Sequence, residues 1–100
     1  MTFSDPELDF LSDMNEQSSS RFVTFIGHSM KRFDLVITTT NRFYGKKLVT
    51  DLQAGRTAIL GSDDLEEEGY LERIFSLEEE EGEELRTFLY QVLGEPYFTD

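Results

Sequence analysis

The chain from Arg21 to Leu60 is a series of short segments rich in β-branched and aromatic residues, and this pattern limits the fold more than any other feature. In residues 33–39, apolar side chains alternate with polar ones, which is typical of a strand that buries one face. Residues 21–26 carry apolar side chains at both odd and even positions, so we expect both faces of that strand to be covered. The sequence therefore predicts a sheet with more apolar surface than one side can hide.

Five strands are predicted, and short links connect them. A turn at Ala54 and Gly55 joins the third and fourth strands as a tight hairpin, because glycine readily adopts a positive φ. Short connections between consecutive strands favour an antiparallel meander. The predicted strands are residues 21–26, 33–39, 43–52, 56–60 and 70–75.

One long helix is predicted near the C-terminus. Ser76 and Glu79 have the spacing of a capping box, in which each side chain accepts a hydrogen bond from the other residue's backbone amide. Gly94 is placed to end the helix, and the apolar residues 96–98 could then pack on the domain. The apolar stripe of this helix is Leu77, Leu85, Phe88, Leu89 and Val92.

These elements predict one α+β domain over residues 21–100: a five-stranded antiparallel meander packed by one C-terminal helix. A curled half-barrel is the alternative form of the same sheet. Residues 1–20 form a separate acidic segment. Within it, residues 5–14 have apolar side chains near helical spacing, so a short helix and a flexible tail are both consistent with the sequence. Residues 15–20 read as a linker.

The charges are sorted along the chain. Residues 1–20 hold five acidic and no basic side chains, residues 21–60 hold two acidic and seven basic, and residues 61–100 hold fourteen acidic and two basic. This sorting suggests contacts between segments or between copies of the chain. The net charge of −12 argues against general affinity for nucleic acids and for anionic membranes.

The chain has no cysteine, so disulfides and thiolate chemistry are excluded. It has neither a basic segment before an apolar run at its start nor an apolar stretch of membrane-spanning length. The sequence therefore predicts a cytoplasmic protein that does not enter a membrane.

Four segments of the chain carry a resemblance to a known family: residues 31–35, 42–46, 63–66 and 69–72. On these segments, from about residue 21 to residue 90, the chain resembles a family of small uncharacterised proteins of Gram-positive bacteria. The resemblance implies a cytosolic bacterial protein, with the first twenty residues outside the shared region. It implies no activity, cofactor or catalytic residue.

Two acidic runs are candidate binding features. Residues 63–68 could hold Ca²⁺ or Mg²⁺, although they lack the alternating spacing of a calcium loop, and a solvated loop is the other interpretation. Residues 78–84 place like charges four apart on the predicted helix, and Gly82 weakens that helix further. This run is either a fraying, solvated turn or an acidic surface for a basic partner.

A set of basic and aromatic residues lies between residues 31 and 56, on and beside the predicted strands: Lys31, Arg32, Phe33, Arg42, Phe43, Tyr44, Lys46, Lys47 and Arg56. Such residues could stack bases and hold phosphates, while lysine at a sheet edge also deters stray strand pairing. His28 is the only histidine and is interpreted as an ordinary loop residue, since no nucleophile motif accompanies Ser29. No catalytic, cofactor-binding or metal-binding residue is predicted, and no cofactor.

The sequence favours a non-enzymatic, homodimeric protein–protein interaction module, because one helix is too narrow to cover both faces of the sheet. An unidentified protein partner is a further expectation. The first alternative is a nucleic-acid-associated regulator, and the second is a small enzyme with an acid–base carboxylate such as Asp34 or Asp63. The predicted interaction surface is Lys31, Arg32, Arg42, Phe43, Tyr44, Lys46, Asp63, Asp64 and Glu66.

Overall fold

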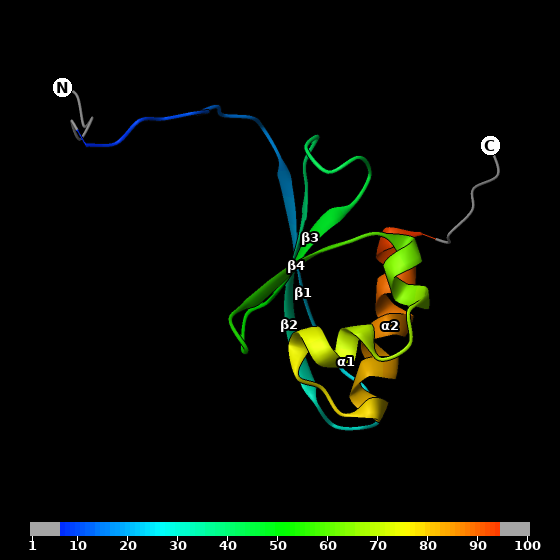
Figure 1. Ribbon diagram of the computed structural model, residues 1–100. Helices are drawn as coiled ribbons and strands as arrows, with labels where there is room; N and C mark the ends of the chain where they lie inside the picture. The colour runs from blue at the N-terminus through cyan, green and yellow to red at the C-terminus, as the bar shows by residue number, and fades with distance from the viewer. Residues whose placement is uncertain (1–6, 95–100) are drawn as a thin grey trace, which may run out of the picture.

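The computed structural model describes residues 7–94 and contains a sheet covered on one side by helices (Figure 1). The sheet is an antiparallel meander of neighbours β1-β2-β3-β4. Both the α+β class and the meander are confirmed, but the described residues form four strands rather than five. The strands are β1 (Ser19–Ile26), β2 (Arg32–Thr39), β3 (Lys47–Asp51) and β4 (Arg56–Leu60), and the helices are the 3₁₀ helix η1 (Ser62–Glu66), α1 (Tyr70–Phe75) and α2 (Glu79–Leu93).

The core lies between the sheet and the helices. Along β2, Phe33, Leu35 and Ile37 point into it, as the alternation predicts, and each is at most 2% exposed. Phe25 of β1 stacks on Phe33 and also contacts Phe88 of α2, with ring centroids 5.0 Å apart in both pairs. The other buried apolar residues are Val49, Leu60, Leu65, Leu71, Phe75, Leu85 and Leu89.

Residues 70–75, predicted as a fifth strand, form the helix α1. Leu71 and Phe75 are buried on one side of α1, at a spacing of four residues that fits a helix as well as a strand. The residues that flank the helix set its ends: Gly69 and Ser76 both adopt left-handed conformations, with φ of 77° and 56°. The covering layer therefore contains two α-helices, not one.

The predicted start of the C-terminal helix is also wrong. Ser76 ends α1, and α2 begins at Glu79. The capping box is present but lies two residues later, where the backbone N–H of Glu78 donates to Glu81 over 2.9 Å. The C-terminal end is confirmed, since Gly94 caps α2 with its N–H on the Tyr90 carbonyl.

Two loops refine the prediction for the sheet. β3 begins at Lys47 rather than at residue 43, because Tyr44 and Gly45 adopt positive φ values of 54° and 90° and so cannot continue a strand. The turn at Ala54 and Gly55 is confirmed, and Gly55 has a φ of 70°.

Residues 7–18, which we call the arm, form neither helix nor strand and run outward from the start of β1 (Figure 1). The helix predicted for residues 5–14 is absent from its described part, which begins at residue 7. Residues 96–98, predicted to pack on the domain, lie outside the described residues. Within the described part of the chain, no helix has the length and apolarity needed to cross a membrane.

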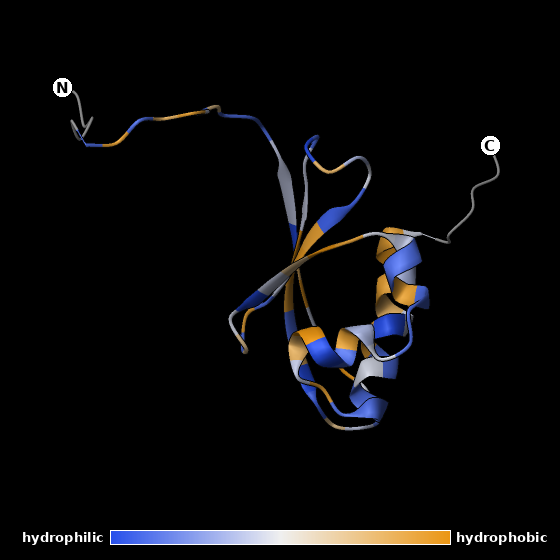
Figure 2. Cartoon of the chain, viewed as in Figure 1, coloured by the Kyte–Doolittle hydropathy of each residue, from blue (hydrophilic) through white to orange (hydrophobic). Residues whose placement is uncertain are grey.

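The second face of the sheet is open. The helices cover one side, and the apolar segments of α1 and α2 turn toward it (Figure 2). On the opposite side Phe22, Ile26, Leu52 and Ile59 are between 42% and 73% exposed. The expectation that both faces of residues 21–26 are covered is therefore not met within a single copy, because its helices cover only one face of the sheet.

Candidate functional site

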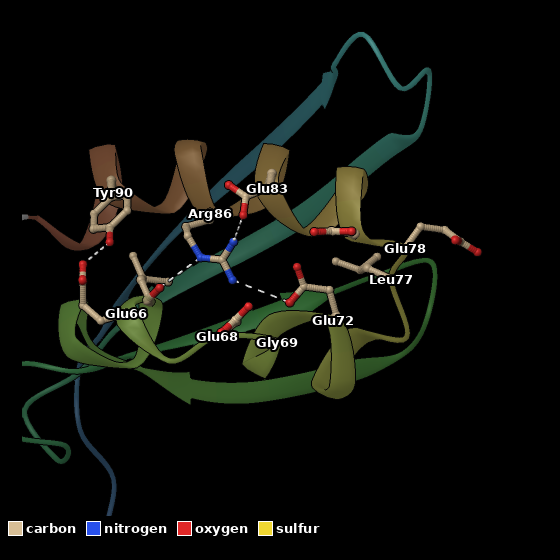
Figure 3. Close-up of a pocket in the computed structure, with 11 residues that line it drawn as sticks. Glu66, Glu68, Gly69, Glu72, Leu77, Glu78, Glu83, Arg86 and Tyr90 are labelled. Atoms are coloured by element: carbon tan, nitrogen blue, oxygen red, sulfur yellow. Dashed lines mark hydrogen bonds and ion pairs between the residues drawn. The ribbon is translucent and has the colours of Figure 1, made fainter.

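A groove runs between the η1–α1 segment and α2 (Figure 3). Its volume is about 660 Å³, and it carries six carboxylates and a single arginine. We call it the acidic groove. Its lining residues are Leu65, Glu66, Glu68, Gly69, Glu72, Leu77, Glu78, Glu79, Glu83, Arg86 and Tyr90.

Arg86 of α2 points across this groove and connects its two walls (Figure 3). Its Nε donates a hydrogen bond to the carbonyl oxygen of Leu65 over 3.0 Å, and its Nη1 donates to Glu83 over 2.8 Å. Its side chain is only 13% exposed. A planar guanidinium has donors for several acceptors at once, so Arg86 ties η1 to α2 while filling part of the groove.

Glu72 of α1 faces Arg86 but is incompletely satisfied. The distance from Arg86 Nη2 to Glu72 Oε1 is 3.6 Å, which allows electrostatic attraction but is too long for a hydrogen bond. Among the described residues, Oε1 of Glu72 is the one buried side-chain oxygen or nitrogen atom without a hydrogen-bond partner. Because a buried carboxylate oxygen without a hydrogen bond is energetically unfavourable, an additional donor at this position would be stabilising.

The remaining acidic side chains leave the groove strongly negative. Glu66 accepts a hydrogen bond from the hydroxyl of Tyr90. Glu68, Glu78 and Glu79 are exposed, and none of them forms an ion pair with a lysine or arginine of the described chain. The groove can therefore attract a cation, with apolar contact available from Leu65 and Leu77.

The structure joins one basic and one acidic part of the predicted interaction surface. Lys46, just before β3, lies 3.1 Å from Asp64 of η1, and this contact raises the pKa of Lys46. Asp64 also accepts the backbone N–H of Gly61 over 2.8 Å. Asp63 is exposed and lies outside the acidic groove, whereas Glu66 lines it.

The basic and aromatic residues do not form a single surface. Lys31 and Arg32 lie at the start of β2, and residues 42–44 lie in the turn after its end. A strand of eight residues separates the two groups by roughly 25 Å. Arg32 pairs with Asp34 at 3.2 Å, and Tyr44 is 99% exposed. This arrangement gives no support to the nucleic-acid alternative.

Asp34 occupies the open face of the sheet and is held as an anion. Its carboxylate accepts hydrogen bonds from Thr24 over 2.6 Å and from Gln53 over 2.8 Å. These two bonds, followed by the charge of Arg32, lower the pKa of Asp34 below its ordinary value. A carboxylate stabilised in this way is poorly suited to donate a proton at neutral pH.

A second cluster, which the sequence did not predict, surrounds His28. Its Nε2 lies 3.1 Å from Glu80 and its Nδ1 lies 3.4 Å from Glu84. Both oxygens of Glu84 accept hydrogen bonds from Ser29, one from the N–H and one from the hydroxyl, each over 2.7 Å. The cluster therefore attaches the β1–β2 loop to α2. Its only sequence signal is the pair of glutamates four residues apart on the helix.

His28, Glu80 and Glu84 are close enough to bind one metal ion, since their ligand atoms lie within 4.8 Å of one another. However, the two ring nitrogens of His28 face different carboxylates, and Glu84 is already bonded twice to Ser29. The described contacts account for the cluster as a structural link between loop and helix.

Comparison with protein families gives one match, the SAV0927-like family, over residues 11–91. The chain belongs to the SAV0927-like family. This family is a family of small uncharacterised domains, as the resemblance predicted. Its match begins inside the arm, so part of the first twenty residues belongs to the shared region, contrary to the prediction. No curated protein matches the chain.

Proposed function

We propose that the protein is a non-enzymatic interaction module whose acidic groove binds a basic segment of a partner protein. The observation that carries this proposal is the composition of the groove, in which six carboxylates accompany one arginine. Arg86 occupies only part of the space and interacts with Glu72 and Glu83. The groove thus already accommodates one guanidinium and retains an excess of negative charge.

Arginine and lysine side chains match the groove in both charge and shape. Their aliphatic stems can pack on Leu65 and Leu77, while their charged ends reach the carboxylates at the rim. A volume of about 660 Å³ is also within the range of roughly 300–1,000 Å³ typical of ligand sites. Arginine is the favoured residue, because its planar fork can bond a carboxylate through two parallel hydrogen bonds.

The proposal predicts that an arginine octapeptide binds the full chain and that binding weakens as salt is added, because the attraction is between exposed charges. Fluorescence anisotropy of a labelled peptide measures this directly. We expect Glu68→Gln and Glu79→Gln each to weaken binding about 2- to 5-fold, the effect typical of one exposed ion pair.

Glu67→Gln is the matched control. Glu67 is an exposed glutamate beside Glu68 that does not line the groove. Its carboxylate lies 3.1 Å from Nη2 of Arg73. The substitution changes the net charge by the same amount and should leave binding within about 1.5-fold of the wild-type value. Equal losses in all three variants would mean that the peptide senses only the net charge of −12, and the proposal would then fail.

A location in the cytoplasm stays a prediction from the sequence.

A further inference from the structure

The outer edge of β1 is free in the described chain. β1 is the first strand of the sheet and pairs with β2 alone, through an unbroken register from Ser19↔Thr39 to Ile26↔Arg32. It has eight residues with one charged side chain, Arg21, and neither a proline nor a bulge. Such an edge lacks the usual features that prevent pairing with another strand.

The arm has a side-chain pattern that fits a strand. If residues 7–14 are extended, Leu8, Phe10 and Met14 fall on one side, and the acidic residues of the segment fall on the other. Leu11 is the exception, since it shares the acidic side. All four apolar side chains are 59% or more exposed, so the single copy leaves the apolar residues of the arm uncovered.

The base of the arm is turned away from the free edge of its own β1. Oε2 of Glu16 accepts a hydrogen bond from the backbone N–H of Asn41 over 3.0 Å. Asn41 follows β2, so this bond holds the arm on the β2 side of β1, opposite to the free edge. Figure 1 shows the arm leaving the sheet rather than folding back along it. The arm therefore does not pair with the free edge of its own β1.

We propose that two copies exchange their arms, with residues 7–14 of each copy pairing antiparallel with the free edge of β1 in the other. Antiparallel pairing is the direction that already joins all neighbouring strands of this sheet. Each sheet then gains a fifth strand by addition to its edge, and Leu8, Phe10 and Met14 lose contact with water.

The charges of the chain give this dimer a distinctive salt dependence. Each copy has a net charge of −12, so two copies repel each other and added salt should strengthen the dimer by screening that repulsion. Binding of a basic peptide in the acidic groove depends on salt in the opposite sense. The dimer and the groove use different residues, so either can fail without the other.

Sedimentation equilibrium of the full chain tests the proposal over about 1–100 µM, the range in which a dimer of micromolar affinity dissociates. The wild-type chain is expected to dimerise, and Phe10→Asp combined with Met14→Asp is expected to weaken the dimer about 100-fold or more, because two buried apolar side chains are lost. Both residues are exposed in the single copy, so circular dichroism should be unchanged.

Asp9→Asn combined with Asp13→Asn is the matched control on the other side of the arm, and it should retain the dimer. Hydrogen exchange of the β1 amides that point away from β2, toward the free edge, should be slow in the dimer and faster on dilution. A wild-type chain that stays monomeric, or a Phe10→Asp, Met14→Asp variant that dimerises normally, overturns the proposal. A monomer in which the β1 amides that point away from β2 are protected also overturns it, because the arm would then pair with its own strand.

Discussion

Gly82 of α2 lies directly against the side chain of Glu72 of α1. A Cβ atom built on Gly82 would overlap the carboxylate of Glu72 and lie 2.7 Å from its Cγ. Gly82 is buried although it is in the acidic first half of α2. The absence of a side chain at this position is therefore what allows α1 and α2 to approach closely beside the acidic groove.

This contact predicts that Gly82→Ala destabilises the protein. In an exposed helix the change would add about 1 kcal/mol of stability, because alanine is the better helix former. Here the whole Glu72 side chain, from Cγ outward, must move and lose its position beside Arg86. We expect the free energy of unfolding to fall by about 1 kcal/mol or more, measured by urea denaturation.

Removing Glu72 supplies the control for this prediction. In a Glu72→Ala background nothing from that side chain obstructs a Cβ at position 82, so Gly82→Ala should become stabilising by up to about 1 kcal/mol. If Gly82→Ala has the same effect in both backgrounds, the close approach of the two residues does not determine its cost.

Arg86→Lys should cost about 1–3 kcal/mol of stability, since lysine cannot reproduce the hydrogen bonds to Leu65 and Glu83 together. The largely exposed Arg73, which pairs only with Glu67 among the ion pairs of the described chain, is the matched site. Arg73→Lys is expected to change the free energy of unfolding by less than about 0.5 kcal/mol. Similar losses from the two changes would show that Arg86 does not hold η1 on α2.

The two residues of the Lys46–Asp64 pair should contribute unequally. Asp64→Ala removes both the ion pair and the acceptor for the Gly61 N–H at the start of η1, so we expect a loss of about 1–2 kcal/mol. Lys46→Met removes only a pair whose lysine is 40% exposed and should cost about 0.5 kcal/mol or less. Thermal denaturation of the two variants compares these losses, and a larger loss in Lys46→Met would contradict the assignment.

Acid should weaken the link between the β1–β2 loop and α2. The pKa of Glu84 is lowered from 4.5, chiefly by the hydrogen bond from the Ser29 hydroxyl, with smaller help from the Ser29 N–H and the charge of His28. A lowered folded pKa means that this stabilisation is complete above pH 4.5 and is lost as the pH falls through the folded value.

Ser29→Ala should therefore move the pKa of Glu84 up toward 4.5 and make the loss of stability on acidification smaller. A carboxyl NMR titration follows Glu84 itself, and Ser18→Ala in the exposed arm is the control. An unchanged Glu84 titration in Ser29→Ala would show that the hydroxyl is not the main cause.

The sequence predicted the sheet better than the helical layer, for a physical reason. The alternation along β2 and the glycine at position 55 are local signals, and both are confirmed. In a segment as short as residues 70–75, apolar residues four apart fit both the two-residue period of a strand and one turn of a helix. The segment forms a helix, in which Leu71 and Phe75 both pack into the core. Helix propensity alone predicts that Gly82 destabilises α2. It does not take into account that the Glu72 side chain packs against Gly82, because no local sequence pattern reveals this contact.

The candidate site was predicted only in its separate parts. The acidic run at residues 78–84 suggested a surface for a basic partner, whereas residues 63–68 suggested a cation site or a solvated loop. Residues of both runs meet in one groove: Glu66, Glu68, Glu78, Glu79 and Glu83. The sequence did not predict that Glu72 and Arg86 complete this groove, because their meeting depends on how α1 packs against α2. Likewise, strand direction separates Lys31 from Arg42, although both had been assigned to one surface.

The most direct test of the account is an amide NMR titration of the full chain with the arginine octapeptide. We predict that the shifts concentrate at Gly69, Leu77 and the Nε–H of Arg86, that they saturate, and that they diminish as salt is raised. Shifts confined to the open sheet face around Phe22 and Ile59, or no shifts at low salt, would contradict the assignment of the acidic groove as the binding site.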